Sequence, residues 1–506
     1  MMLGIPGAGQ SKSQEALGPS AKAYQRGAAA LQQGDVPGAQ ADFEEAVRLD
    51  PKDVNSRRAL ARVLSQQQKI DNAIAQMREA VRLEPKSAEI HDELGVLLVQ
   101  KGDAAGAATE FSKALQLDHH YEPAQFHSGV LSLKSGDSPT AAKQLAEAVR
   151  LDPKDALAQY YLGNALEATN DRNGALKAYS DSVKLNPDFL PAQTHLGLLA
   201  QRSGDMDRAV AAFTKSAELA PNDVEARNNL GLALMQQGEG EASVKQLQQA
   251  LKLSPGDAEI RGNLAVAYMQ LSNYDAAVEQ LREALRIAPD KASLHYDLGL
   301  ALKFKDDLPG AVVELKEATK LDPTLADGYY TLAVTLWQQG DFPASAEQLR
   351  NALTVKPDYA EAYYMLGTVL KQMKQLPEAA QALREAIRLQ PTYAGAHTTL
   401  AAVLRQMGDK EGAEKETQAG EALARQKTNA QAAVFSLNSG KRLMRTGDLE
   451  GAVSQLRNAT NLAPNSADAH YQLALALSRH GEKKEAAVEY EKAVQLNPHF
   501  QSSPLQ

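Results

Sequence analysis

The sequence predicts an all-α fold, a solenoid of about fourteen helix-turn-helix repeats stacked along one axis. The first observation is a series of prolines whose spacings are all multiples of 34 residues. The second is that a small residue and a Gly-Asp pair recur at fixed offsets before these prolines. The third is that no window shows the period-two alternation of a half-buried strand. The prolines stand at residues 51, 85, 153, 187, 221, 255, 289, 323, 357 and 391, with His119 at the vacant slot.

Two later prolines, Pro464 and Pro498, are again 34 residues apart but lie five residues out of phase with the first series. The phase shift predicts a main array over residues 20–408, holding repeats 1 to 11 and the start of repeat 12. A short second array, repeats 13 and 14, is expected over residues 433–498. Residues 409–432 are expected to form the degenerate end of repeat 12 and a junction with longer helices. Two interpretations of this junction remain open, a hinge and a tolerated insertion.

The first helix of each unit carries a small residue about 24 residues before the proline, as at Gly27 and Gly95. Glycine inside a helix costs about 1 kcal/mol relative to alanine. Its recurrence therefore predicts that the second helix of the unit approaches closely at this point. The second helix shows small residues around one large apolar residue, as in Ala39, Phe43 and Ala46, a spacing that keeps one helical stripe facing inward.

The turn between the two helices of a unit carries the Gly-Asp pair. Glycine can adopt the left-handed conformation that ends a helix, and aspartate can accept hydrogen bonds from the first amides of the next helix. The proline then ends the second helix, because it disfavours the helical conformation of the residue before it. The pairs begin at Gly34, Gly102, Gly136, Gly204, Gly340, Gly408 and Gly447.

With these features the chain resembles the tetratricopeptide repeat proteins, in particular bacterial-type arrays with many repeats, over about residues 20 to 498. The resemblance implies a right-handed superhelix whose concave groove is lined by the first helices. The leucine of the family is well kept, as at Leu94 and Leu298. The family's usual tryptophan is absent. A longer polar residue replaces it in some units, and in others the replacements are Tyr329, Tyr363, His91, His295, His397 and His470.

The composition argues against several classes of function and of site. The formal net charge of −9 argues against a nonspecific nucleic-acid binder, which needs a basic surface to contact phosphates. The absence of cysteine excludes disulfides and thiolate metal sites. No stretch approaches the 18 or so apolar residues of a membrane span. Residues 1–19 and 499–506 are expected to be tails, the first of them disordered.

Catalytic motifs are absent from the sequence. There is no phosphate-binding glycine loop, no nucleophile elbow and no dinucleotide fingerprint. His119, His120 and His127 form the one local histidine cluster, and they lack the spacing of a metalloprotease helix. We therefore expect no enzymatic activity, no cofactor and no bound metal.

Candidate binding residues come from the register of the repeats. In the family, unit positions 5, 9 and 12 of the first helix share one stripe that faces the groove. Tyrosine and tryptophan beside cations are typical of binding hot spots, so units nine to twelve are predicted to bind an extended, acidic or aromatic peptide segment. The alternative is that the tyrosines only pack against the next unit. The predicted residues are Tyr296, Tyr330 and Tyr364 at position 5 and Lys303, Trp337, Lys371 and Arg405 at position 12.

These observations favour a protein-interaction scaffold for protein or peptide partners, without nucleic acid. The alternative is an envelope or secretion assembly factor of the polysaccharide-export or pilus type. A third class, the repeat half of a glycosyltransferase-like system, is indicated by Asn229 and Asn263 alone. The compartment stays open between cytoplasm and periplasm, because Gly7, Ala8 and Gly9 resemble the end of a truncated export signal. A monomer is expected, with self-association through the C-terminal end as the alternative.

Overall fold

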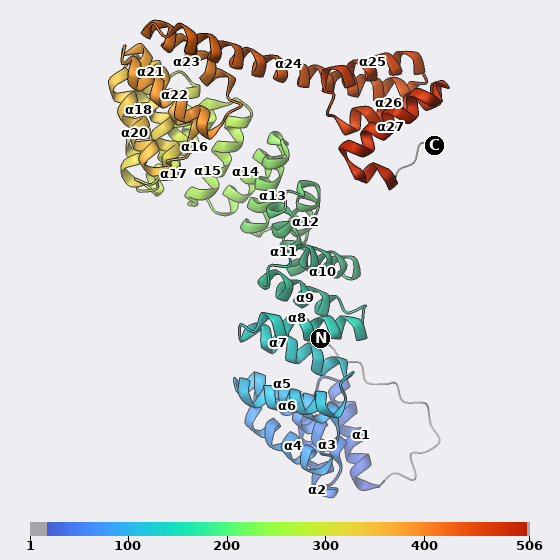
Figure 1. Cartoon of the computed structure of the whole chain (residues 1–506). Coiled ribbons are helices and arrows are strands. Elements are labelled where there is room, and N and C mark those ends of the chain that lie inside the picture. The colour runs from blue at the N-terminus through green and yellow to red at the C-terminus, as the bar shows by residue number, and fades with distance from the viewer. Residues whose placement is uncertain (1–17, 503–506) are drawn as a thin grey trace. The chain divides into compact units, whose positions relative to one another are not determined.

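The computed structural model describes residues 18–502, and within them the chain forms α-helices, one short 3₁₀ helix and no strand. The predicted all-α stack of helix pairs is confirmed (Figure 1). The chain divides into two compact units, residues 1–255 and residues 256–506. Successive helices pair into repeats, so that α1 and α2 form repeat 1 and α21 and α22 form repeat 11.

The first unit contains repeats 1 to 7. Its helices are α1 (Pro19–Gln32), α2 (Val36–Leu49), α3 (Val54–Gln66), α4 (Ile70–Leu83), α5 (Ala88–Lys101), α6 (Ala104–Leu117), α7 (Glu122–Lys134), α8 (Ser138–Leu151), α9 (Ala156–Ala168), α10 (Arg172–Leu185), α11 (Leu190–Arg202), α12 (Met206–Leu219), α13 (Val224–Gln237) and α14 (Gly240–Leu253).

The second unit contains repeats 8 to 14. Its helices are α15 (Ala258–Gln270), α16 (Tyr274–Ile287), α17 (Ala292–Phe304), α18 (Leu308–Leu321), α19 (Ala326–Gln338), α20 (Phe342–Val355), α21 (Ala360–Gln372), α22 (Leu376–Leu389), α23 (Ala394–Met407), α24 (Lys410–Thr446), α25 (Leu449–Leu462), α26 (Ala467–His480), α27 (Lys483–Leu496) and the 3₁₀ helix η2 (Pro498–Ser502).

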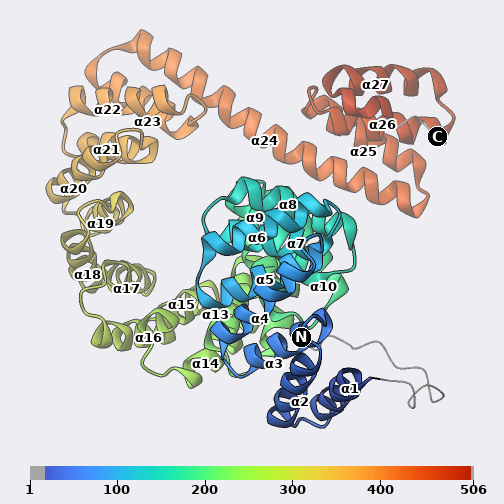
Figure 2. The same cartoon turned by 90° about the horizontal axis from the view of Figure 1, so that it is seen from below.

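The long helix α24 spans the segment where a junction was expected. It is 37 residues long, whereas the other α-helices of the described residues have 13 or 14 residues. Figures 1 and 2 show it as one uninterrupted helix. Its first part packs against α23 as the second helix of repeat 12, and its last part packs against α25 as the first helix of repeat 13. The turn that elsewhere separates two repeats is therefore absent between repeats 12 and 13.

The small residues of the first helices lie where the paired helix approaches, as predicted. A β-carbon added to Gly197 would lie 2.6 Å from the ring of Phe213, and one added to Gly129 would lie 2.7 Å from Cγ of Leu145. Phe213 and Leu145 are completely buried. Glycine is therefore needed because the large residue of the second helix occupies the space of a side chain.

The turns within the units have the predicted chemistry. All seven glycines of the Gly-Asp pairs have positive φ, as at Gly102 with a φ of +85°. The carboxylate of Asp103 accepts a hydrogen bond of 2.8 Å from the backbone N–H of Gly106 and caps α6. In five other turns the left-handed residue is not glycine, and these residues are Gln68, Asn170, Ser272, Asp306 and Lys374.

In many units a polar side chain at position 4, the position of the family's tryptophan and one residue before position 5, bonds the first helix to the turn before it. Nδ1 of His91 lies 2.6 Å from Oε2 of Glu110, and its Nε2 lies 3.2 Å from the carbonyl oxygen of Pro85. In two other units the carbonyl oxygen of the equivalent proline accepts a hydrogen bond, from Nε2 of Gln193 at 2.9 Å in one and from Nε of Arg227 at 2.8 Å in the other. The histidines at the tryptophan position are thus structural, and the arrangement of His91 recurs at His295, His397 and His470.

The predicted tails fall largely outside the described residues. Residues 1–17 and 503–506 are not described, whereas Pro19 already belongs to α1. Near the other end, the ring of Phe500 in η2 stacks on Tyr471 with centroids 4.5 Å apart. The hydroxyl of Tyr490 donates a hydrogen bond of 3.0 Å to the carbonyl oxygen of Phe500. Part of the expected C-terminal tail therefore packs on the last repeat.

Over residues 18–502, no helix combines the length and the apolar character that crossing a bilayer requires.

Candidate functional site

The first helices of repeats 9 to 12, namely α17, α19, α21 and α23, carry the seven predicted binding residues. Tyr296, Tyr330 and Tyr364 are each partly buried, with some of the side chain left accessible. At position 12, Lys303, Trp337 and Lys371 are also partly buried, and Arg405 is exposed. Positions 5 and 12 are seven residues apart, so within each helix the two residues lie on the same side.

Each predicted tyrosine contacts the following repeat. The hydroxyl of Tyr296 lies 3.5 Å from Oγ1 of Thr331 on α19. The rings of Tyr330 and Tyr359 have centroids 5.2 Å apart, and those of Tyr364 and Tyr393 are 4.8 Å apart. Such contacts are expected under the alternative interpretation, in which the tyrosines only pack against the next unit. The tyrosines nevertheless keep accessible surface, so packing uses only part of each ring.

The partners Tyr359 and Tyr393 were not predicted from the sequence. They are the residues immediately before α21 and α23, outside the helix positions on which the prediction was based. Their own spacing of 34 residues is the signal that could have found them. We call Tyr330, Tyr359, Tyr364 and Tyr393 the tyrosine ladder.

Carboxylates border the tyrosine ladder at the start of the first helices. The hydroxyl of Tyr359 donates a hydrogen bond of 2.8 Å to Oδ1 of Asp327. Burial, with this hydrogen bond and the charge of Asp327, raises the pKa of Tyr359. Burial, with the charges of nearby groups including Glu361, raises the pKa of Tyr393 to about 12. These phenols therefore stay neutral at physiological pH and can donate hydrogen bonds.

The predicted cations lie at the other end of the same helices. Burial lowers the pKa of Lys303. Among the described residues, the cation found over an aromatic ring is Lys356, whose Nζ lies 4.4 Å from the ring centroid of Tyr359. Neither Lys303 nor Lys371 takes such a position on Trp337. A shallow depression instead brings the tryptophan together with Gln338, Gln339, Gly340, Phe342 and Gln372.

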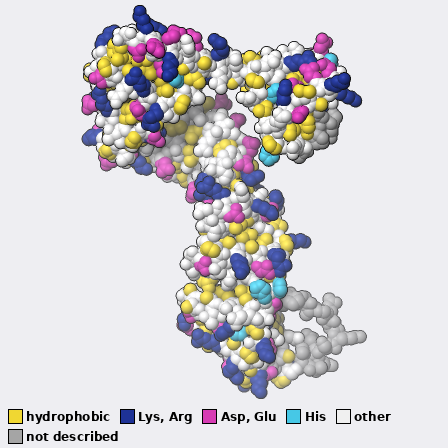
Figure 3. Space-filling model, in the orientation of Figure 1, with side chains coloured by type: hydrophobic (Ala, Val, Ile, Leu, Met, Phe, Trp, Pro, Cys, Tyr) yellow, Lys and Arg dark blue, Asp and Glu magenta, His cyan; other side chains and the backbone are white. Residues whose placement is uncertain are grey.

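The three histidines of the predicted cluster in the first unit contact different partners. Nδ1 of His127 lies 2.9 Å from Oδ1 of Asp92, a carboxylate whose pKa is raised by burial despite the nearby imidazole. The rings of His119 and His120 meet edge to face with centroids 5.6 Å apart. Within residues 18–502, no three histidine or acidic side chains are grouped to hold a metal ion. On the face shown in Figure 3, basic and acidic side chains are interspersed.

Comparison with protein families finds the same repeat along most of the chain. A model described as tetratricopeptide repeat matches residues 24–74, 58–121, 129–188, 194–258, 233–292 and 330–394. A second model with this description matches residues 467–500, and one described as TPR repeat matches residues 305–340 and 440–481. No curated protein sequence matches the chain.

Among solved structures, the chain is similar to several helical-repeat proteins. MamA from Desulfovibrio magneticus RS-1 is 27% identical over 33% of this chain and 95% of its own, with a TM-score of 0.31. YrrB, described as a TPR protein with an unusual peptide-binding site, is 24% identical over 37% of this chain and 97% of its own, with a TM-score of 0.33. The Cut9-Hcn1 structure aligns over 95% of this chain and 94% of its own at 14% identity, with a TM-score of 0.34. Because the repeat model matches more than half of its length, the chain belongs to the tetratricopeptide repeat family.

Proposed function

We propose that the chain is a non-enzymatic protein-interaction scaffold that binds an extended peptide segment of a partner across α17, α19, α21 and α23. The repeat architecture supports a scaffold role, because stacked repeats present an extended concave surface to their partners. The observation that carries the proposal is the tyrosine ladder. Four partly accessible tyrosines from consecutive repeats contact each other in pairs along one part of the stack.

The chemistry of the ladder suits a peptide with aromatic or apolar side chains. Tyrosine offers a large rigid surface at a low cost in conformational entropy, and its hydroxyl can bond to a peptide backbone. Asp327 and Glu361 lie at the second residue of their helices, and Lys371 and Arg405 lie ten residues beyond that position. Ten helical residues span roughly 15 Å, so an acidic edge and a basic edge of the proposed site lie about this far apart. A carboxylate of the segment would therefore favour the edge with Lys371 and Arg405.

The proposal can be tested with synthetic peptides and the single tryptophan of the chain, Trp337. Three peptides of about ten residues, the reach of an extended chain over roughly 30 Å, would alternate phenylalanine with aspartate, asparagine or lysine. We expect the aspartate peptide to bind most tightly, to change the emission of Trp337, and to bind more weakly at high salt. Tyr330→Ala should weaken its binding by about tenfold, and Lys371→Ala should reduce the preference for aspartate.

A matched control is available on α16. Tyr274 is also partly buried and lies in the same unit, but its ring stacks on Phe304, outside the ladder. Tyr274→Ala should therefore bind the aspartate peptide as the parent does. Circular dichroism would show that each variant keeps its helix content. If Tyr330→Ala and Lys371→Ala both bind like the parent, or if Trp337 emission is insensitive to bound peptide, the groove lies elsewhere.

A further inference from the structure

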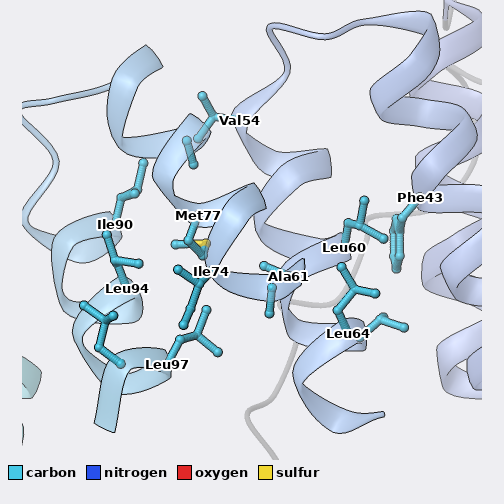
Figure 4. Close-up of a cluster of buried hydrophobic side chains, with 14 of the residues drawn as sticks. Phe43, Val54, Leu60, Ala61, Leu64, Ile74, Met77, Ile90, Leu94 and Leu97 are labelled. Atoms are coloured by element: carbon cyan, nitrogen blue, oxygen red, sulfur yellow. The ribbon is translucent and has the colours of Figure 1, made fainter. Parts of the chain in front are cut away.

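The first helix of repeat 13 exposes a face that other repeats bury against the repeat before them. In those repeats position 3 of the first helix packs under the second helix of the repeat before it. Figure 4 shows this arrangement for Ile90 of α5, which lies on the side of that helix facing Met77 of α4. Ile90 is 1% exposed. The corresponding residue of repeat 13 is Phe435, which is 74% exposed.

The reason for this exposure is the continuity of α24. In other repeats the preceding second helix ends, and a turn brings it back alongside the next first helix. Here the preceding second helix and the next first helix are the same straight helix, so the covering position beside Phe435 is left without a helix. Val434, the neighbouring residue, is 57% exposed. Phe435 is the most exposed large apolar side chain among residues 18–502.

The segment of α24 that contains Phe435 carries basic and no acidic residues. Residues 422–446 contain five lysines and arginines and no aspartate or glutamate, although the whole chain has a net charge of −9. Lys441 is paired, with Nζ 2.6 Å from Oδ2 of Asp468. Within the described part of the chain, no carboxylate pairs with Lys427, Arg442 or Arg445. Successive steps of three or four residues form one exposed stripe of α24, made of Lys427, Gln431, Phe435, Asn438, Arg442 and Arg445.

We propose that this stripe of α24, centred on Phe435, binds an acidic amphipathic α-helix of a partner protein. Two observations select this partner. The equivalent face in the repeats inside a stack is covered by a helix, so its shape accepts one, with an apolar residue over Phe435. The unpaired cations on both sides of Phe435 complement acidic side chains, and such complementarity steers and selects partners. The stripe is separate from the tyrosine ladder, so this inference does not depend on the proposed function.

The last helix of a second copy of the chain is a weaker candidate for the same face. The α27 helix carries several glutamates, but η2 packs at its end through the hydrogen bond from Tyr490 to Phe500. The C-terminal end of the stack is thus already partly covered. Self-association is therefore an outcome that the experiment distinguishes from partner binding.

The probes are three fluorescent helix-forming peptides of about 18 residues, which span roughly the 27 Å of the stripe. They share one leucine face and carry glutamate, glutamine or lysine on the rest of the surface. With the full chain, fluorescence anisotropy should show that the glutamate peptide binds at least about tenfold more tightly than the glutamine peptide. Phe435→Ala should weaken that binding by about tenfold, and the double variant Arg442→Glu, Arg445→Glu should prefer the lysine peptide.

Phe304→Ala is the matched control, because Phe304 is also a highly exposed phenylalanine of the second unit, at 57%, but lies on α17. It should bind the glutamate peptide as the parent does. Four results would each overturn the proposal. The first is that the three peptides bind alike, and the second is that Phe435→Ala binds like the parent. The third is that anionic vesicles or a DNA duplex displace the glutamate peptide in a Phe435-dependent way at lower concentration than the unlabelled peptide. The fourth is that the chain self-associates on concentration and that Phe435→Ala abolishes this association.

Discussion

His91 and Glu110 join the two helices of repeat 3, with Nδ1 of the imidazole 2.6 Å from Oε2 of the carboxylate. The other ring nitrogen contacts the carbonyl oxygen of Pro85, so one side chain connects both helices of its repeat to the turn before it. Both His91 and Glu110 are largely buried. A broken contact would therefore leave polar atoms with little access to water, which costs more than an exposed pair is worth.

Replacing His91 should show which of its two contacts matters. His91→Leu removes both contacts and should lower the free energy of unfolding by about 1 to 3 kcal/mol. His91→Gln should lose less, because Gln125 and Gln193 reach the equivalent carbonyl in their own repeats. Urea denaturation followed by circular dichroism measures both changes. His119→Leu is the control, because the side chain of His119 is exposed and the substitution leaves unchanged the backbone carbonyl that accepts from Gln125. Equal stability of the parent and His91→Leu would contradict this account.

Asp297 predicts a dependence of stability on pH. Burial raises the pKa of this carboxyl to about 6, from 3.8. In repeat 3 the carboxylate at the equivalent position, Glu93, accepts a hydrogen bond from Arg58, which stands 35 residues earlier. The residue 35 positions before Asp297 is Gly262, which has no side chain to donate such a bond. Because the folded state favours the protonated form, Asp297 lowers stability progressively as the pH rises from about 4 to about 6.

The substitution Asp297→Asn removes this penalty. The variant should be more stable than the parent by about 1 to 3 kcal/mol at about pH 8, and the difference should shrink toward zero at about pH 4. Urea midpoints of both proteins over this range give the comparison. Asp307→Ala removes a helix cap at an exposed site of the same repeat, so it should destabilise the protein instead. A constant difference between Asp297→Asn and the parent at all pH values would contradict the assignment.

The fold was predictable because its signals are local and repeated. Most turns within the repeats carry a residue signal, as Gly102 and Asp103 do, and each close approach is marked by a small residue, either a glycine such as Gly197 or an alanine such as Ala265. The fused helix α24 was not predicted, although no glycine or proline stands between Gly420 and Gly440 to end a helix. The prediction assumed that the regular repeat continued with longer helices. The exposure of Phe435 follows from this fusion and could not be deduced from a register that assumed a covering helix.

The candidate binding site was predictable only in part. The register located Tyr330 and Tyr364, because position 5 recurs at every 34 residues. It did not locate Tyr359 or Tyr393, since the turns between repeats were read only as helix ends. The register also placed Lys303 and Lys371 in the repeats on either side of Trp337, but it could not predict how these long flexible side chains lie, because their surroundings determine it. In the structure, Gln372 shares the depression with Trp337.

Lys374 occupies a turn position where other repeats use glycine. Its φ is +61°, and the left-handed conformation costs a residue with a side chain about 1 to 2 kcal/mol. Lys374→Gly should therefore raise the free energy of unfolding by about 0.5 to 1 kcal/mol, after the entropic cost of glycine. The reciprocal change Gly408→Lys, at a φ of +86°, should destabilise by a similar amount. Thermal denaturation of both variants checks the pair, and a loss of stability in Lys374→Gly would contradict the strain argument.

Gly197 and Phe213 test the fit between the helices of repeat 6. Gly197→Ala places a methyl group 2.6 Å from the Phe213 ring and should destabilise the protein by about 1 to 3 kcal/mol through overpacking. In repeat 8 the same position is Ala265, and the facing residue is the smaller Leu281; both are fully buried. Phe213→Leu alone should also destabilise, because it leaves space beside Gly197.

The double variant Gly197→Ala, Phe213→Leu recreates the pair of repeat 8. It should be more stable than the sum of the two single changes predicts, with a favourable coupling of about 1 kcal/mol or more. Urea denaturation of the four proteins of this cycle gives the coupling energy. Gly204→Ala, in the turn of the same repeat, is the comparison for Gly197→Ala, because there the cost arises from backbone conformation and Phe213→Leu should not reduce it. Strictly additive effects at Gly197 and Phe213 would show that direct contact does not select glycine at this position.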